Sequence, residues 1–469
     1  MIDTFAIRCS ILHLAFSGKL TGQAEEDGTA ADLLYKICPQ KTISQTEKTP
    51  YSLPDSWAWV RIADLYKINP KVEADGSIDA AFIPMERISG GFDRSFTIET
   101  QSWDQAAKNH TRFADGDVAF AKITPCFENR KSFIAKNLPN GIGGGTTELI
   151  ILRQPEMLPE FTYFLVLDQR FISTGVASYK GTVGQQRVQT DVIKNYLVPV
   201  PPYAEQKRIV EKIEQAFSAL DTIDALQTQY ADNLSVLKGK LIDAAIQGKL
   251  TEQLPEDGTG EELYRRIQEE KQALIKAGKI KKDQPLPEVT NEEIPFEIPT
   301  NWKWARFRDL GVFSGGKTPS MAKKEYWSNG VVPWVTSKDM KQKYITSSEM
   351  LISELAAKEM TIHPAKTVLF VVRSGILRRM FPVAILTEKG TVNQDLKALE
   401  LFVPEMYEYV YYVLKGLEPT ILFKYTKDGT TVNNIVFDAL LTMPVPLPPL
   451  AEQERIVKHL NELFRALEA

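Results

Sequence analysis

Residues 311–318 read GVFSGGKT, which matches the G-x-x-x-x-G-K-T pattern of a phosphate-binding loop in nucleotide hydrolases. Such a loop works where a strand delivers it and a helix begins at its Lys-Thr pair, because backbone N–H groups then point at the phosphates. Here Pro319 follows Thr318 at once and removes one N–H donor. A P-loop nucleotide hydrolase is therefore a distant alternative, and we expect Lys317 to meet a phosphate backbone instead.

Other residues that could do chemistry are few and scattered. The three cysteines, Cys9, Cys38 and Cys126, are too far apart for a disulfide framework or a zinc site, and the four histidines show no metal-ligating spacing. No apolar stretch reaches the ~18 residues that span a bilayer, and the N-terminal segment lacks the basic start of a signal peptide. We predict no catalytic site, no metal site, no membrane partner and a cytoplasmic location.

The most informative feature of the chain is an internal repeat. Three pairs of segments match in the same order: 11–37 with 241–267, 51–65 with 296–310, and 198–221 with 443–468. The first pair shares GKLT and EDGT, and the last pair shares an AEQ block displaced by 247 positions. Since order and offset are both kept, the chain is a tandem duplication.

The duplication is cut inside one element. By these offsets Met1 corresponds to Ala231 and Ala469 to Thr222, so only positions 223–230 lack a counterpart. If that element is a helix, the missing residues span ~12 Å at 1.5 Å per residue. We predict that the two termini lie near each other and jointly rebuild a second copy of the central helix, so that a circular permutation would be tolerated.

A 3-4 apolar alternation runs from Ile209 to Ala244 and predicts a long helix of coiled-coil type. Pro201 and Pro202 mark its start and Gly248 its stop, which gives about 44 residues. The seam of the terminal copy follows Ile456, Leu460, Leu463, Leu467, Ile7, Ile11 and Leu14. A homodimerising coiled coil is the alternative, but the duplication favours an intramolecular pair.

The remaining segments mix β-rich runs with Pro/Gly-punctuated loops and short helices. We therefore predict an α+β fold with two mixed α/β domains in tandem, separated by two long coiled-coil helices, one central and one formed by the C- and N-terminal segments. The predicted divisions are 1–22 (N-terminal part of the second helix), 23–201 (first domain), 202–250 (central helix), 251–448 (second domain) and 449–469 (C-terminal part of the second helix).

Positive charge gathers in local stretches, although the net charge is −4. Residues 306–343 hold eight Lys/Arg against three acids, 372–389 carry a net +3, and 170–190 also carry a net +3. Basic loops rich in Gln, Asn, Ser and Thr suit phosphate contacts combined with hydrogen bonds to base edges.

From charge and polarity we select eleven residues as candidate DNA contacts. In the first domain these are Lys122, Arg130, Lys180, Gln186 and Arg187, and in the second they are Lys317, Lys323, Lys338, Arg373, Asn433 and Asn434. The four basic residues of the second group are expected to contact phosphates. The offset of 247 places Gln186 on Asn433 and Arg187 on Asn434, which predicts that the two segments are equivalent polar probes.

Several blocks occur twice and in order: PVPPYAEQKRIV and PLPPLAEQERIV before the long helices, and GKL after a helix end in both copies. Others are GDVAFAKITP, GGKTPS, EYW, VPWVTSKDM and VNQDLKAL. As a set they resemble the specificity (S) subunits of type I restriction–modification enzymes, over the whole chain.

The resemblance implies a non-catalytic subunit that reads a bipartite, asymmetric target in double-stranded DNA, one half with each domain. It also implies that the helices set the half-site spacing and dock methyltransferase (M) subunits, two in number, together with restriction (R) subunits. S-adenosylmethionine, ATP and Mg would then belong to those partners, with no cofactor in this chain. The recognition subunit of a related multisubunit restriction–methylation enzyme and a scaffold that binds only proteins are the other readings.

Overall fold

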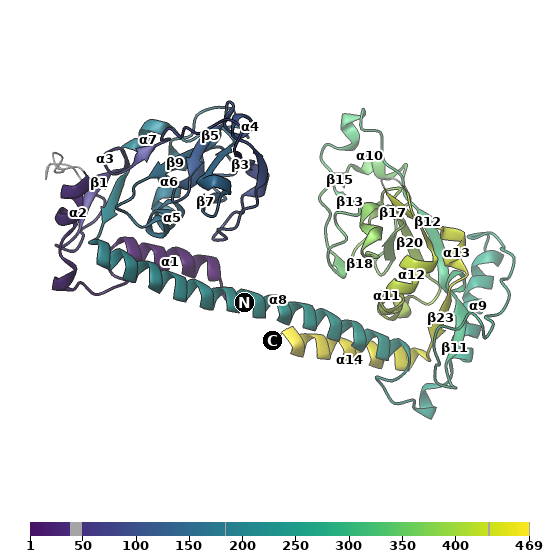
Figure 1. Cartoon of the computed structure of the whole chain (residues 1–469). Helices are drawn as coiled ribbons and strands as arrows, with labels where there is room; N and C mark the ends of the chain where they lie inside the picture. Colours follow the sequence, from purple (N-terminus) through teal and green to yellow (C-terminus); the bar gives the residue numbers. More distant parts are fainter. Residues whose placement is uncertain (38–48, 183, 430–431, 469) are drawn as a thin grey trace. The chain divides into compact units, whose positions relative to one another are not determined.

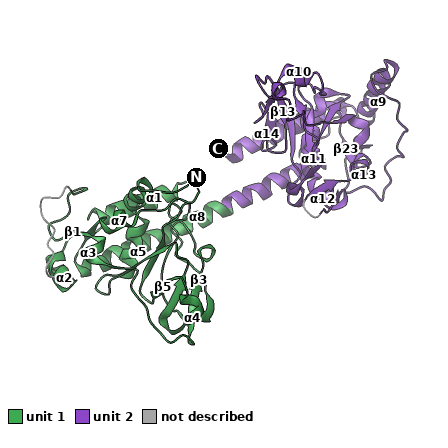
Figure 2. Ribbon diagram, turned by 90° about the horizontal axis from the view of Figure 1, so that it is seen from above, with its two compact units in different colours: residues 1–229 green, residues 230–469 purple. Residues whose placement is uncertain are grey.

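The computed structural model describes residues 1–37, 49–182, 184–429 and 432–468 (Figure 1). Its contacts divide the chain into two compact units, Met1–Gln229 (unit 1) and Tyr230–Ala469 (unit 2), coloured separately in Figure 2. One helix, α8 (Tyr203–Ile246), crosses the division. Each unit has its own hydrophobic core.

Unit 1 is a mixed α/β lobe with two four-stranded sheets, ordered β2-β9-β6-β7 and β4-β3-β8-β5, and a separate pair β1-β10. Its strands are β1 (Ala58–Arg61), β2 (Lys67–Ile68), β3 (Asp79–Ile83), β4 (Glu99–Ser102), β5 (Thr111–Ala114), β6 (Val118–Ala121), β7 (Ser132–Ile134), β8 (Ile142–Gly145), β9 (Leu149–Arg153) and β10 (Leu197–Val200). Its helices besides α8 are α1 (Thr4–Phe16), α2 (Ala30–Ile37), α3 (Ile62–Leu65), α4 (Trp103–Ala107), α5 (Pro159–Leu167), α6 (Gln169–Ala177) and α7 (Thr190–Lys194). The apolar helix α5 lies in the main core, which explains its lack of a polar face.

Unit 2 has a five-stranded sheet, β12-β20-β16-β18-β14, two three-stranded sheets, β15-β13-β19 and β17-β22-β21, and the pair β11-β23. The strands are β11 (Lys303–Arg306), β12 (Gly311–Gly315), β13 (Val332–Val335), β14 (Tyr344–Ile345), β15 (Leu351–Ile352), β16 (Val368–Val371), β17 (Arg373–Ser374), β18 (Val383–Leu386), β19 (Thr391–Val392), β20 (Leu396–Leu401), β21 (Thr426–Lys427), β22 (Asn433–Ile435) and β23 (Pro444–Leu447). The helices are α9 (Gly260–Lys276), α10 (Glu354–Ala357), α11 (Tyr407–Gly416), α12 (Glu418–Lys424), α13 (Phe437–Leu441) and α14 (Leu450–Glu468).

The strand registers confirm the duplication. In unit 1, Ala58 pairs with Val200, and in unit 2, Lys303 pairs with Leu447. Adding the sequence offsets 245 and 247 to 58 and 200 gives 303 and 447. The fold class predicted from the sequence, two mixed α/β domains in tandem with a long helix, is therefore correct.

The GKLT and EDGT blocks form the junction between each lobe and a long helix. In unit 1, the buried Glu205 carboxylate accepts hydrogen bonds from Trp57 Nε1, Thr21 Oγ1 and Gln23 Nε2, each at 2.8 Å. In unit 2, Glu452 accepts from Trp302 Nε1 at 2.9 Å, Thr251 Oγ1 at 3.1 Å and Gln253 Nε2 at 3.0 Å. The repeated motif thus has a structural explanation: it satisfies a buried carboxylate in the same way twice.

An ion pair completes each junction. Arg208 on α8 binds both carboxylate oxygens of Asp27 at 2.6 and 2.5 Å, and Arg455 on α14 binds Asp257 at the same two distances. Before each junction the helix ends at a glycine with positive φ, Gly18 at +72° and Gly248 at +71°. A Cβ on Gly248 would lie 2.4 Å from Pro299 Cγ, so no other residue fits this turn.

The predicted long helix is confirmed, since α8 contains 44 residues. Its two ends contribute to the two cores, with Ile209 and Ile213 in the core of unit 1 and Ala245 and Ile246 in that of unit 2. The middle of the helix is exposed, and Leu226 retains 58% of its accessible surface.

Each terminal helix contacts α8 within its own unit. In unit 1 the backbone N–H of Ile2 donates to Gln227 Oε1 at 2.5 Å. In unit 2, Lys238 Nζ pairs with Glu468 at 2.5 Å. The proximity of the two chain termini stays a prediction. The domain limits drawn from the sequence also stay predictions.

The seam predicted for α1 is wrong in part. Ile7 and Leu14 are 38% and 40% exposed, whereas Arg8 and Leu12 are buried. The helix is rotated because Arg8 pairs with Asp221 at 2.6 Å and Asp224 at 2.9 Å on α8. Arg8 therefore faces α8, although a prediction from the apolar pattern places this charged residue on the solvent side of the helix.

Candidate nucleic-acid interface

In unit 1 the backbone brings four of the five predicted contacts together. Lys180 and Arg187 exchange both backbone hydrogen bonds, at 3.2 and 2.9 Å, across the turn that joins them. The N–H of Thr124 donates to Gln186 O, and the N–H of Val188 donates to Lys122 O, both at 2.9 Å. Residues 180–182 and 184–188 thus lie beside the end of β6, with Lys122, Lys180, Gln186 and Arg187 at neighbouring backbone positions; we call these residues hairpin 1. Lys180 and Arg187 are exposed, whereas Lys122 and Gln186 are half-buried.

Arg187 has a carboxylate partner that the sequence did not reveal. Its Nε and Nη2 donate to the two oxygens of Glu148 at 2.9 and 2.8 Å, and Nη1 donates to Gln185 O at 3.2 Å. The hydrogen bond from Arg187 lowers the pKa of Glu148, which therefore stays ionised. Glu148 was missed because it lies 39 positions from Arg187 in sequence.

Arg130 lies outside hairpin 1, and its burial rules it out as a DNA contact. It is 7% exposed, with Nε donating to Leu167 O at 3.0 Å and Nη2 to Gln169 Oε1 at 2.6 Å. Its guanidinium also lies 4.9 Å from the ring centre of Phe5 on α1. The physical reason is that these contacts bury the guanidinium between Leu167, Gln169 and Phe5, so its role is to hold α1.

Unit 2 repeats the arrangement with the strands β21, β17 and β22. Arg373 pairs with Asn434 across β17 and β22, and Lys427 pairs with Asn434 across β21 and β22. Arg373, Lys427 and Asn434 are exposed. We call residues 427–429 and 432–435 hairpin 2.

Asn433 is not available as a polar probe. It is 4% exposed and its amide donates to Asp428 Oδ1 at 2.8 Å. Adjacent residues of a strand point to opposite faces, so exposure of Asn434 requires burial of Asn433. The equivalence of 187 and 434 predicted from the offset is confirmed, because Arg187 pairs with Lys180 and Ile123 as Asn434 pairs with Lys427 and Arg373.

The GGKT segment is not a phosphate loop of the nucleotide-hydrolase type. Residues 311–315 form β12, and the chain continues through 316–323 without a helix, so no helix N-terminus is presented at Lys317 and Thr318. A Cβ on Gly316 would lie 1.7 Å from Val392 O, which shows that this glycine serves close strand packing. The Oγ1 of Thr318 donates to Gln394 at 2.6 Å. Lys317 is exposed, as a backbone phosphate contact requires.

The other two predicted lysines of unit 2 are exposed but do not join hairpin 2 through any described bond. Lys323 Nζ donates to Tyr326 Oη at 2.6 Å and lies 4.5 Å from the ring centre. Lys338 lies in the turn after β13, where its backbone N–H donates to Thr336 Oγ1 at 3.3 Å. They stay proposals as phosphate contacts.

Part of the predicted positive charge of 306–343 is neutralised inside unit 2. Arg306 is 5% exposed and pairs with Glu293 at 2.7 Å. Lys343 pairs with Glu408 at 3.2 Å, and burial lowers the pKa of Lys343. A count along the sequence therefore overestimates the charge that faces a ligand.

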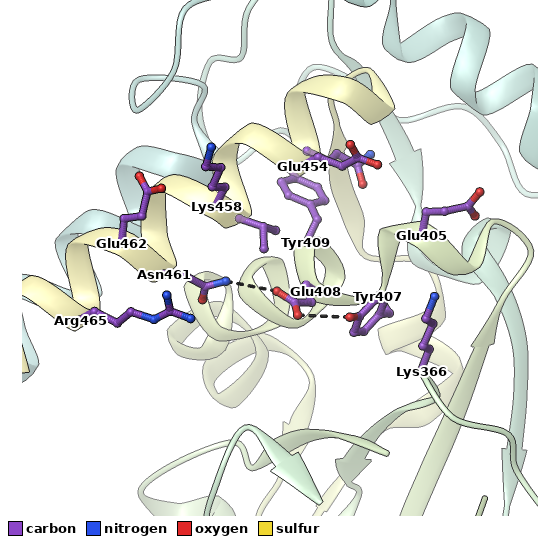
Figure 3. A pocket seen from close by; sticks show the side chains of 12 residues that line it. Lys366, Glu405, Tyr407, Glu408, Tyr409, Glu454, Lys458, Asn461, Glu462 and Arg465 are labelled. Atoms are coloured by element: carbon purple, nitrogen blue, oxygen red, sulfur yellow. Dashed lines mark hydrogen bonds between the residues drawn. The ribbon is translucent and has the colours of Figure 1, made fainter. Parts of the chain in front are cut away.

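A pocket of ≈ 560 Å³ lies in unit 2 where α14 meets α11 (Figure 3). Seven of its lining residues are charged: Glu405, Glu408, Glu454, Glu462, Lys366, Lys458 and Arg465. Glu408 accepts from Tyr407 Oη at 3.2 Å and Asn461 Nδ2 at 3.4 Å. Four carboxylates disfavour a polyanion here, so this pocket is not the DNA site.

The described residues hold no group of three or more His, Cys, Asp or Glu that could bind a metal ion. Cys9 and Cys126 are free thiols, and Cys38 lies outside the described residues. Among the described helices, none is both long and apolar enough to cross a membrane.

A family model described as "Type I restriction modification DNA specificity domain" matches residues 54–229 and 299–469, one match for each repeat. The chain belongs to this family. The specificity subunit of type I restriction enzyme EcoEI from Escherichia coli is 30% identical to the chain over 542 aligned residues, covering 99% of this chain and 90% of that protein. The EcoAI specificity subunit from the same species is 35% identical over 378 residues, covering 67% of this chain and 64% of that protein.

Two solved structures have a similar fold. A chain from a type I restriction–modification system matches with a TM-score of 0.63 at 20% identity, covering 89% of this chain and 93% of the other. The HsdS subunit from Thermoanaerobacter tengcongensis matches with a TM-score of 0.50 at 19% identity, covering 90% and 92%. The family is one of specificity subunits, and the P-loop hydrolase alternative is not supported.

Proposed function

We propose that this chain is the sequence-specific DNA-recognition subunit of a type I restriction–modification complex, in which each unit reads one half of a bipartite, asymmetric target. One observation carries the proposal beyond family membership. Hairpins 1 and 2 have the same backbone pairing but present different exposed side chains, Arg187 in one and Asn434 in the other. Two domains of one fold with unlike polar side chains recognise two unlike half-sites.

Recognition divides between charge and hydrogen-bonding pattern. Lysines such as Lys180 and Lys317 contact phosphates, which supplies affinity that falls with salt but carries no sequence information. Side chains with a fork of donors, or a donor beside an acceptor, distinguish base pairs in the major groove.

Catalysis belongs to partner subunits in this proposal. Two methyltransferase subunits bind along the long helices, use S-adenosylmethionine and methylate adenine, while restriction subunits use ATP and Mg. Exposed apolar residues in the middle of α8 support docking there: Leu226 is 58%, Tyr230 60% and Val236 58% exposed. S-adenosylmethionine, ATP and Mg therefore act outside this chain.

The proposal is tested by mapping methyladenine in a host that carries this gene with its methyltransferase partner, compared with the partner alone. We expect methyladenine at one bipartite motif with unlike halves, only when both genes are present. Methylation of the same motif by the partner alone would contradict the proposal.

A further inference from the structure

The duplication allows each position of hairpin 1 to be compared with its counterpart in the same chain. The bond from Val188 N to Lys122 O measures 2.9 Å, and its counterpart from Ile435 N to Val372 O measures 2.8 Å. The bond from Lys122 N to Glu148 O and that from Val372 N to Asp395 O both measure 2.8 Å. Equivalent side chains therefore start from equivalent backbone positions in the two hairpins.

Two features are kept between the hairpins. An exposed lysine stands at 180 and at 427, paired with 187 and 434 respectively. A carboxylate stands at 148 and at 395, which are 247 positions apart. Features common to both units cannot distinguish the two half-sites, so these residues contact the DNA backbone or stabilise the hairpin itself.

The cross-strand pair beside them differs completely. It is Ile123 with Arg187 in hairpin 1 and Arg373 with Asn434 in hairpin 2. Arg187, Arg373 and Asn434 are exposed, and Ile123 is half-buried. Cross-strand partners lie close enough to touch neighbouring base pairs together. The pair thus combines accessibility with divergence at one fixed place.

The chemistry of Arg187 suits base recognition. A guanidinium has five N–H groups, and the described partners, Glu148 and Gln185, take three of them. Glu148 thereby fixes the plane of the fork while two donors are left for a ligand. A fixed fork loses less conformational entropy on binding a base than a mobile one.

We propose that the cross-strand pairs 123/187 and 373/434 are the specificity-determining residues of the two half-sites, with Glu148 positioning Arg187. This rests on the proposed DNA recognition. Arg187 and Arg373 each read a guanine through O6 and N7, Asn434 reads an adenine through N6 and N7, and Ile123 contacts a thymine methyl group. Arg373 is accordingly reassigned from a phosphate contact to a base contact.

A transplant within the chain tests the pairs. Ile123→Arg, Glu148→Asp and Arg187→Asn together place the residues found at 373, 395 and 434 at the three equivalent positions of unit 1. The variant is expressed with its methyltransferase partner for methyladenine mapping. We expect one half of the motif to change at the bases read by the pair, with about 5- to 150-fold lower methylation of the original half-site. The half read by unit 2 stays unchanged.

Two further variants keep the test decisive if the transplant fails to fold. Arg187→Lys keeps the charge but cannot make the fork, so it should relax one base of the first half-site only. Asn434→Ala should relax one base of the second half-site only. Arg265→Asn, on an exposed position of α9, is the matched control for loss of an arginine and should leave the motif unchanged.

The outcomes separate the inference from the proposed function. If the unmodified chain and its partner give no motif-specific methyladenine, the proposed function itself fails. If the variants assemble with the partner but methylate the original motif, or weaken both halves equally, the pair assignment is overturned. A change confined to the predicted half confirms it.

Discussion

Glu205 and Glu452 are buried carboxylates, each satisfied by three side-chain donors of its own lobe. A glutamine in place of Glu205 keeps one acceptor and turns an NH₂ group toward donors. We therefore expect Glu205→Gln to lower the free energy of unfolding of unit 1 by about 2–3 kcal/mol, and Glu452→Gln to do the same in unit 2. Hydrogen exchange resolved by unit measures this, with the exposed Glu211→Gln as control. If a single replacement destabilised both units equally, it would contradict the expectation that each carboxylate stabilises only its own unit.

Glu293 is a second titratable residue with a testable consequence. Hydrogen bonds from Arg306, and then from the backbone of Thr290, lower the pKa of Glu293 to about 2 from an ordinary value of 4.5. A lowered pKa stabilises the fold fully above the unfolded value, and that contribution is lost as the pH falls from about 4.5 to about 2. Urea unfolding should thus lose stability more steeply in this window for the wild type than for Glu293→Gln. Parallel curves would show that the pair is not coupled to folding.

Lys180 contacts phosphates in the proposed function, and we expect the same of Lys427, its counterpart in unit 2. Replacing either with alanine should weaken binding of the assembled complex to all duplexes by a similar factor. It should also reduce the slope of log affinity against log salt by about 1. Fluorescence anisotropy over a salt series measures both quantities. A loss confined to the cognate duplex would instead make the lysine a base contact.

Among the elements, α1 is attached to α8 by a buried arginine. Arg8, buried on α1, pairs with Asp221 and Asp224 and lies 5.7 Å from the ring centre of Phe217. Arg8→Ala should destabilise the contact of α1 with α8 by about 1–3 kcal/mol and increase hydrogen exchange over residues 4–16. Ile7→Ala is the matched control, because Ile7 is 38% exposed. Faster exchange in the Ile7 variant alone would support the apolar seam predicted from sequence.

Helices α1 and α8 show which parts of the fold can be predicted from the sequence. The length of α8 was predictable because two prolines precede it and Gly248 follows it, and these residues act locally. The orientation of α1 was not, since it depends on a salt bridge to residues more than 200 positions away. Local signals identify an element, whereas its buried face is set by tertiary contacts.

The candidate site follows the same rule. The hairpin equivalence was predictable because a gapless offset carries the register of one repeat onto the other. The pairing of Glu148 with Arg187 and the burial of Arg130 were not, because both depend on partners 37 or 39 positions away in the sequence. Strand alternation could have shown that only one of Asn433 and Asn434 faces outward.

At the scale of the whole molecule, the repeat predicts a viable circular permutant. Joining Ala469 to Met1 through IDALQTQY, the sequence of residues 223–230, would complete a second copy of the long helix, and the chain could be opened after Gly278. We expect the permutant to direct methylation to the same motif as the original chain. A permutant with the same residues scrambled to break the apolar pattern serves as control and should be less stable. If the matched linker gives no folded protein while the original ends are tolerated, the terminal segments do not form one helix.

The divergent pair on the two hairpins also bears on how such a system changes its target. In the proposed function one polypeptide supplies recognition for modification and for cleavage alike, so a replacement at Arg187 or Asn434 that changes the target would redirect both activities in the same event. A cell that acquires such a replacement would methylate the new target sequence, which is the same sequence that cleavage would then recognise. The backbone hydrogen bonds of the hairpins do not involve these side chains, so a single-codon replacement can change the target without disrupting the hairpin. Modification and cleavage would then recognise the same sequence at every stage.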